Sequence, residues 1–225
     1  MLSSPNVEQA RFNMIEQQIR TWDVLDQGVL ALLAIVKRED FVPAPYRSMA
    51  FVDAELPLPT SDGAAESMLS PKVEARLLQE LTLARHESVL EIGAGSGHMA
   101  ALMAHKARHV TTLDIHPDLA RLAADNLRRA AVVNVAVRHA DGAAGLPAEA
   151  PFDAILLSGS VAAVPPALLA QLKVGGRLVA IVGQQPIMRA TRTVRTSEER
   201  FESVDLFDTV ASRLHGFDEP TRFHF

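Results

Sequence analysis

Three glycines at alternate positions follow an acid in the stretch "VLEIGAGSGHMA", residues 89–100. The acid is Glu91 and the glycines are Gly93, Gly95 and Gly97. Glycine tolerates positive φ and lets the backbone come close to a bound molecule, and a helix that begins directly afterwards offers unpaired N–H groups. The pattern therefore predicts a turn that binds a small molecule.

Two further acids stand where strands are expected to end. Asp114 closes "HVTTLDI", at a place where nucleoside-binding folds put an acid that accepts hydrogen bonds from ribose hydroxyls. Asp141 follows "NVAVRHA" and is placed to accept a hydrogen bond from the exocyclic amine of an adenine. Each acid has a structural alternative. Asp114 or Asp118 can cap the helix that begins near "HPDLA", and Asp141 can form an ordinary Asp-Gly turn.

The spacing favours one nucleoside cofactor over another. NAD-type loops read G-x-G-x-x-G, whereas here His98 stands at the third glycine position and Glu91 would repel a pyrophosphate. A cofactor that carries an ammonium and a sulfonium is compatible with this acid. The sequence therefore predicts S-adenosylmethionine, and E-x-G-x-G-x-G resembles the first motif of the class I methyltransferases. The residues expected to bind the cofactor are Glu91, Gly93, Ala94, Gly95, Gly97, Asp114, Ile115, Asp141 and Gly142.

Short apolar strands that alternate with amphipathic helices must position these residues. The expected strands are 88–93, 109–115, 134–140, 152–158 and 176–183, and the expected helices are 98–107, 117–130 and 165–172. Before them, helical spacing predicts two helices within 7–36, broken near "TWD", and a third helix over 71–83. The stretch 41–67, rich in proline and small polar residues, is expected to be irregular.

This alternation is typical of a parallel sheet with helices on both faces. Two strand-like runs around "TSEER", within 190–207, predict a hairpin at one edge of the sheet. We therefore expect an α/β fold, a doubly wound Rossmann-like methyltransferase sheet with a C-terminal β-hairpin edge and an N-terminal helical extension. Residues 1–80 would form the extension and a loop on the substrate side, and residues 81–225 the cofactor-binding core, within one structural domain.

Composition excludes several functions. A formal charge of −5 with scattered basic residues argues against nucleic-acid binding, and the absence of cysteine removes disulfides, thiolate metal sites and cysteine nucleophiles. Neither a signal peptide nor a membrane-spanning stretch is expected, so we expect a soluble cytoplasmic protein. No metal site is expected either. His105 and His109 have the spacing of a helical ligand pair but lie across a helix end and the next strand.

Longer segments carry a closer resemblance. "MIEQQIRTWDVLDQGVLALLAIVKREDFVP" ends in an R-E-x-F-V-P motif, and "DGAAGLPAEAPFDAILLSGSVAAVPPALLAQLKVGGRLVAIVG" contains an Asp-Gly turn, an A-P-F-D-A-I strand and a Q-L-x-x-G-G-R-L-V turn. From about residue 7 to 183 the chain resembles the protein-L-isoaspartate (D-aspartate) O-methyltransferase family. The resemblance implies methylation of the α-carboxylate of isoaspartyl residues in damaged proteins, whose ester then closes to a succinimide without the enzyme.

The chain departs from this family in one motif. The family has an I-S-x-P signature before the helix that precedes the first strand, and aligning Pro71 puts Leu69 at the serine. Ser67 and Ser70 lie on either side, so the resemblance leaves them as candidate catalytic donors to the acceptor carboxylate. Ser70 can instead serve only as the N-cap of the helix that Pro71 opens. No acid–base pair is needed, because a carboxylate is already a nucleophile and positioning dominates the reaction.

Other functions remain open. A relative with the same cofactor and a different acceptor, a non-catalytic S-adenosylmethionine-binding protein, and an NAD-dependent oxidoreductase each fit part of the pattern, although Glu91 and His98 argue against the last. The ending "ASRLHGFDEPTRFHF" lacks the family's V-x-F-V-P-L. Its His215 and His224 either dock on the body or a partner, or stay mobile. The oligomeric state is left open.

Overall fold

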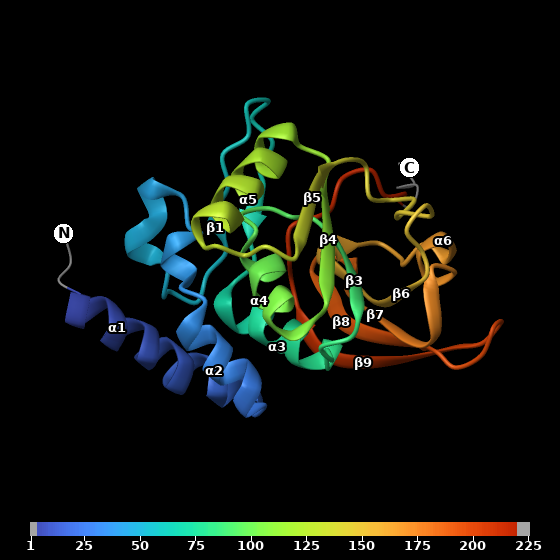
Figure 1. Cartoon of the computed structure of the whole chain (residues 1–225), viewed down its shortest axis with the longest axis horizontal. Helices are drawn as coiled ribbons and strands as arrows, with labels where there is room; N and C mark the ends of the chain where they lie inside the picture. The colour runs from blue at the N-terminus through green and yellow to red at the C-terminus, as the bar shows by residue number, and fades with distance from the viewer. Residues whose placement is uncertain (1–3, 220–225) are drawn as a thin grey trace.

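A computed structural model describes residues 4–219 as a sheet covered mainly by helices on one side (Figure 1). The helices are α1 (Ser4–Asn13), α2 (Gln27–Ile35), α3 (Pro71–Leu81), α4 (His98–Lys106), α5 (Pro117–Arg129) and α6 (Pro166–Leu169). A π-helical segment, η1 (Met14–Ile19), and three 3-10 segments, η2 (Arg20–Trp22), η3 (Arg38–Asp40) and η4 (Ala44–Met49), connect the first of them. Within the described residues, no helix has the length and apolar character needed to cross a bilayer.

The main sheet has seven strands in the order β5-β4-β3-β6-β7-β8-β9. These strands are β3 (Ser88–Ile92), β4 (His109–Asp114), β5 (Val135–His139), β6 (Phe152–Val161), β7 (Leu172–Gln184), β8 (Ile187–Arg195) and β9 (Phe201–Thr209). The first five are parallel, and β8 and β9 are antiparallel. The expected parallel sheet and its edge hairpin are therefore confirmed. Strand order reverses at β3, which has β4 on one side and β6 on the other, and ligands of open α/β sheets bind at such a point.

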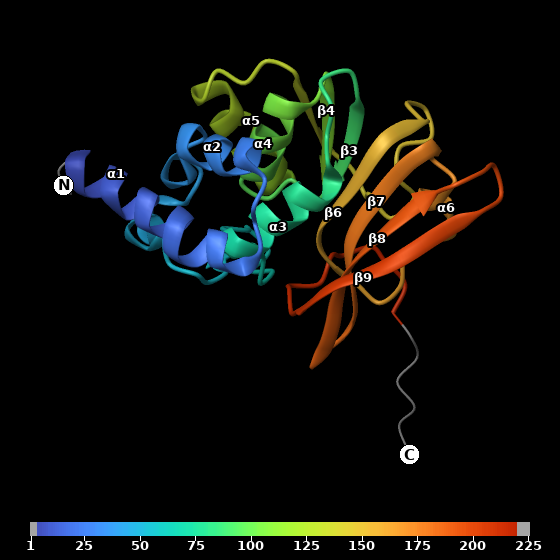
Figure 2. The same cartoon turned by 90° about the horizontal axis from the view of Figure 1, so that it is seen from below.

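The two faces of the sheet differ more than the sequence predicted. Helices α3, α4 and α5 lie against one face, and α1, η1 and α2 form a further layer outside them (Figures 1 and 2). Among the described residues, α6, a single turn, is the one helix on the opposite face, where parts of 140–150 and 214–217 also pack on the apolar side chains of the sheet. The expectation of helices on both faces is therefore only partly right. The connection from β5 to β6 is irregular because two glycines and two prolines interrupt 142–151, and both residue types are poor helix formers.

The N-terminal helices break where the sequence predicted. After η2 the backbone of Asp23 turns left-handed, with a φ of 60°, and α2 begins four residues later. The Asp26 carboxylate caps α2 by accepting the Val29 N–H at 2.9 Å. Buried apolar residues of these helices belong to the same core cluster as those of α3 and α4. The division of the chain near residue 80 remains a prediction.

The stretch 41–67 is more ordered than expected. It contains η4 and a short antiparallel pair, β1 (Leu56–Pro57) with β2 (Ser67–Met68). The residues between the two strands form what we call the 58–66 loop. Its Ser61 N–H donates to the Asp118 carboxylate of α5 at 3.0 Å. The loop is thereby held next to the carboxyl ends of the sheet strands.

Candidate active site

The glycine loop joins β3 to α4 at the point where strand order reverses. Gly93, Gly95 and Gly97 have φ values of 94°, 51° and 82°, so all three adopt the left-handed backbone that glycine was expected to supply. The loop also approaches α5 closely, because a Cβ added to Gly97 would lie 3.1 Å from the Ala123 backbone. A side chain at this glycine would push the loop away from α5.

Asp114 binds the glycine loop from the neighbouring strand. Its carboxylate accepts the N–H of Gly95 at 2.8 Å and the N–H of His116 at 2.9 Å. Burial raises the pKa of this carboxyl above its usual value, against the effect of these two donors. The structure provides no side-chain cap for α5, whose N-cap residue is His116, so neither Asp114 nor Asp118 has the capping role considered above.

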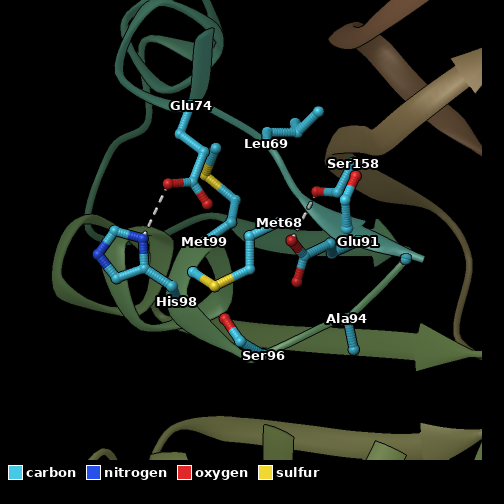
Figure 3. Close-up of a pocket in the computed structure, with 12 residues that line it drawn as sticks. Met68, Leu69, Glu74, Glu91, Ala94, Ser96, His98, Met99 and Ser158 are labelled. Atoms are coloured by element: carbon cyan, nitrogen blue, oxygen red, sulfur yellow. Dashed lines mark hydrogen bonds and ion pairs between the residues drawn. The ribbon is translucent and has the colours of Figure 1, made fainter. Parts of the chain in front are cut away.

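The first of two pockets at this edge, which we call the Glu91 pocket, lies between the glycine loop and the start of α3 (Figure 3). Its lining combines the loop, the β2 region, the start of α4 and the serine at the carboxyl end of the apolar run of β6. These residues are Ser67, Met68, Leu69, Glu74, Glu91, Gly93, Ala94, Gly95, Ser96, His98, Met99 and Ser158.

Glu91 is fully buried, and both of its carboxyl oxygens accept hydrogen bonds, of which Figure 3 shows the one from Ser158. Thr112 Oγ1 and Ser158 Oγ each donate to it at 2.7 Å. Burial raises the pKa of Glu91 to about 8, and these two donors only partly offset the effect. No Lys or Arg within residues 4–219 forms an ion pair with this acid. A ligand with an ammonium or sulfonium would favour the ionised form of Glu91 and pair with it, so the site fits a cationic cofactor.

The second pocket, the Asp114 pocket, shares Gly93 with the first and extends along the ends of β3 and β4. It is lined by Glu66, Ile92, Gly93, Leu113, Asp114, Ile115, His116, Ala140, Gly142, Leu214 and His215. Gly142 is required here because a Cβ at this position would lie 2.3 Å from Ile92 Cγ2. Together the two pockets form a site along the glycine loop, with a buried acid in each part.

Most of the residues predicted to bind the cofactor lie in these pockets. Those that line one or both are Glu91, Gly93, Ala94, Gly95, Asp114, Ile115 and Gly142. Gly97 lines neither pocket and instead packs on α5. Asp141 is exposed, and its Oδ1 accepts the Ala143 N–H at 2.9 Å, as in the ordinary turn considered as its alternative. For all nine residues, contact with the cofactor remains a prediction.

The candidate serines have different surroundings. Ser67 lines the Glu91 pocket, donates to Glu55 Oε2 at 2.7 Å and lies 2.8 Å from the hydroxyl of Ser212. Ser70 is the N-cap residue of α3, but its side chain makes no capping hydrogen bond. Leu69, at the position of the family's serine, is buried and lines the pocket.

A buried polar network next to the pocket was missed by the sequence analysis. Glu74 of α3 forms an ion pair with Arg38 of η3 and lies 3.0 Å from His98 Nδ1. Arg38 also donates to the Leu69 carbonyl at 2.7 Å, which fixes the backbone that lines the pocket. Burial acts to raise the pKa of Glu74, but the charge of Arg38 and then that of His98 lower it overall. Glu74 is therefore ionised while the nearby Glu91 binds its proton near neutral pH.

Ser158 was also missed, although a signal for it existed. It follows the apolar run of the strand expected at 152–158, and the carboxyl ends of parallel strands meet at one edge of the sheet. Arg38 likewise begins the R-E-x-F-V-P motif, although the motif alone did not indicate its pairing with Glu74. By contrast, nothing local marks Glu66, because its place in the Asp114 pocket depends on segments far apart in the chain.

The seven-stranded sheet, with a glycine loop at its switch point and an acid at the end of the next strand, defines a Rossmann-like S-adenosylmethionine-dependent methyltransferase. A sequence profile described as protein-L-isoaspartate (D-aspartate) O-methyltransferase (PCMT) matches residues 9–211. The chain belongs to this family, which confirms the class of enzyme and the cofactor predicted from the glycine loop.

Curated relatives agree with this assignment, and solved structures agree with the fold. A protein-L-isoaspartate O-methyltransferase of Rhodopseudomonas palustris is 41% identical over 196 residues, with 87% of this chain and 88% of the relative covered. One from Koribacter versatilis is 38% identical over 198 residues, covering 88% of this chain and 87% of that one. A solved protein-L-isoaspartate O-methyltransferase, 23% identical, has a TM-score of 0.80 over 92% of this chain and 66% of its own. A Plasmodium falciparum structure named as a beta-aspartate methyltransferase in complex with S-adenosyl-L-homocysteine, 18% identical, has a TM-score of 0.77, covering 92% and 97%.

Proposed function

We propose that this protein transfers a methyl group from S-adenosylmethionine to the α-carboxylate of isoaspartyl residues in damaged proteins. The family match over residues 9–211 carries the proposal. The position of the Glu91 pocket supports it, because Ser67 to Leu69 on the substrate side face the glycine loop across this pocket.

Within this proposal each pocket has a distinct role. Glu91 would bind near the positively charged part of the cofactor, whereas Asp114, at the end of β4, would accept hydrogen bonds from the ribose. S-adenosylmethionine supplies a methyl group on a sulfonium, which a carboxylate can displace directly. The protein's contribution is to exclude water and to position the acceptor oxygen within about 3–3.5 Å of that methyl group in line with the bond that breaks.

The activity is tested by titrating the protein with S-adenosylmethionine in a calorimeter and then measuring methyl transfer to an isoaspartyl peptide and to its aspartyl twin. We expect saturable binding and methylation of the isoaspartyl peptide alone. The aspartyl twin controls for nonspecific carboxyl methylation, since it differs only in the linkage of one residue. Failure to bind S-adenosylmethionine would contradict the cofactor assignment, and binding without transfer would contradict the acceptor.

Ser67 and Ser70 are the proposed donors to the acceptor carboxylate. Replacing both, as Ser67→Ala/Ser70→Ala, should lower kcat/KM for the isoaspartyl peptide by about tenfold or more, as expected for the loss of a hydrogen bond to a charged group. The affinity for S-adenosylmethionine should stay the same. Ser203→Ala, in β9 at the far edge of the sheet, is a matched control. Unchanged turnover in the double variant would eliminate both serines as donors.

One observation favours a second function, methylation of a different acceptor by the same chemistry. Ser67 donates to the carboxylate of Glu55, so a negative charge already lies next to the hydroxyl that would have to bind an acceptor carboxylate. Leu69 provides no hydroxyl where the family has a serine. An uncharged or cationic acceptor would suit these surroundings, and the same assay with amine and alcohol acceptors distinguishes the two functions.

A further inference from the structure

Glu66, His116 and His215 come from three separate parts of the chain and meet at the Asp114 pocket, which all three line. Glu66 ends the 58–66 loop, His116 lies in the turn between β4 and α5, and His215 lies in the segment after β9. The Nε2 atoms of His215 and His116 are 2.9 Å and 3.3 Å from Glu66 Oε1. Each residue offers one ligand atom, and these atoms all lie within 4.8 Å of one another.

Two atoms of this cluster lack the partners that buried polar atoms normally have. Glu66 Oε1 and His116 Nε2 are buried, and neither makes a hydrogen bond to any of the residues described. The contacts of the two Nε2 atoms with Glu66 Oε1 therefore lack hydrogen-bond geometry, although they are short. A cation at the centre of the cluster would pair with the carboxylate and both imidazoles at once.

A second carboxylate supports His116 from behind. The other ring nitrogen of His116, Nδ1, lies 3.4 Å from Asp62 Oδ2 in the 58–66 loop. Histidines that bind metals usually present their second ring nitrogen to a carboxylate or carbonyl, which fixes the tautomer and makes the free nitrogen a better ligand. Asp62 is placed to do this, and it would leave the lone pair of His116 Nε2 facing Glu66.

Two imidazoles and one carboxylate are a ligand set that Zn²⁺ uses when it keeps a fourth position open. We propose that Glu66, His116 and His215 bind a divalent transition-metal ion of the Zn²⁺ class at the rim of the Asp114 pocket. No local pattern predicts this site, because its three ligands are far apart in the chain and only the folded loops bring them together.

The position of this ion indicates that it joins two segments of the chain across the Asp114 pocket. The segment after β9 already covers the cofactor site, since a Cβ added to Gly93 would lie 2.9 Å from Leu214 Cδ2 and one added to Gly216 would lie 2.5 Å from Asp141 Oδ1. An ion held by Glu66 and His215 ties this segment to the 58–66 loop across the pocket. Metal binding therefore holds the cover closed and slows exchange of the molecule beneath it.

The test uses full-length protein without an affinity tag, freed of metal with a chelator and titrated with Co²⁺ and then Zn²⁺. Co²⁺ should give the visible d–d absorption of a site with nitrogen and oxygen ligands, and Zn²⁺ should displace it at one ion per chain. Glu66→Gln and His215→Asn should each weaken binding at least tenfold. Asp62→Asn should weaken it about tenfold to a hundredfold, as loss of an outer carboxylate does elsewhere.

His105→Asn is the matched control, because this histidine is exposed at the end of α4 and lies outside the cluster. Its affinity for Zn²⁺ should equal that of the parent protein. The side chain of His215 is 55% exposed, so His215→Asn should fold, which a thermal melt verifies. Lack of Zn²⁺ binding in the micromolar range, or binding that Glu66→Gln and His215→Asn leave unchanged, would overturn the proposal. None of these readouts depends on methyl transfer.

Discussion

Replacing Glu91 with glutamine will flatten the pH dependence of stability between about pH 5 and pH 8. Burial raises the pKa of Glu91 from 4.5 to about 8, so the folded protein binds a proton in this range that the unfolded chain releases. Stability therefore falls as pH rises from the unfolded pKa to the folded pKa, by about 1.4 kcal/mol for each pH unit from this group. Because the pKa of Asp114 is also raised, this group too lowers the stability as the pH rises.

The measurement is the free energy of unfolding by urea, without cofactor, for the parent protein and Glu91→Gln across this pH range. Thr112 and Ser158 contact different oxygens of Glu91, so the glutamine carbonyl oxygen can accept from one hydroxyl while its NH₂ group donates to the other. This arrangement resembles that of a protonated Glu91, so the variant should be as stable at pH 5 and more stable at pH 8. Glu87→Gln is the control. Arg177 lowers the pKa of Glu87 against the effect of burial, so the stability that ionised Glu87 contributes is complete above about pH 5.5. Above that pH, the difference in unfolding free energy between the parent protein and Glu87→Gln should stay constant. If the unfolding free energy falls equally steeply with pH in Glu91→Gln and in the parent protein, the raised pKa of Glu91 is contradicted.

Replacing Arg38 with methionine will destabilise the protein by about 3–5 kcal/mol, because it leaves Glu74 as a buried charge without its main partner. The Arg38 side chain is 2% exposed and that of Glu74 6%. His98 remains next to Glu74 but is no substitute for a permanently charged guanidinium. The Leu69 carbonyl also loses its donor. Urea unfolding at pH 7 measures this loss.

A second variant separates a lost charge pair from lost packing. Arg38→Met/Glu74→Leu removes both charges and should recover most of the stability, since buried pairs are often replaced by apolar residues without loss. Arg128→Met is the matched control. Arg128 pairs with Asp125 on the exposed face of α5, so its loss should cost less than about 0.5 kcal/mol. If Arg38→Met, like this control, costs less than about 0.5 kcal/mol, the buried pair does not stabilise the fold.

Local sequence patterns were sufficient for the sheet and for the backbone geometry of the glycine loop. Gly93, Gly95 and Gly97 were found because a turn with positive φ admits few other residues, and Asp114 because it ends an apolar strand. Both signals lie within a few residues of the feature that they predict. The same holds for Pro71, which opens α3 where expected.

The features that were missed depend on contacts between distant segments. Glu66 and His215 have no local signal, since each becomes a neighbour of His116 only after the 58–66 loop and the segment after β9 have packed. The single turn of α6 was overestimated because "PPALLAQL" has helical spacing, but the chain must enter β7 at Leu172. The position of α6 in the fold therefore limits it to a single turn, although its sequence favours a longer helix.

Strand order also affects how the protein folds. β7 pairs with β8 and β8 with β9, each with the next strand in the chain, whereas β3 pairs with β6 across two intervening strands. Because closing a long loop costs more entropy, we expect the meander of β7–β9 to form before the β3–β6 contact. The Glu91 pocket lies at that contact, between Glu91 of β3 and Ser158 of β6, so a chain with two separately formed halves has no complete binding site. S-adenosylmethionine therefore binds only the completed sheet and, by mass action, draws the final step of folding toward the native state.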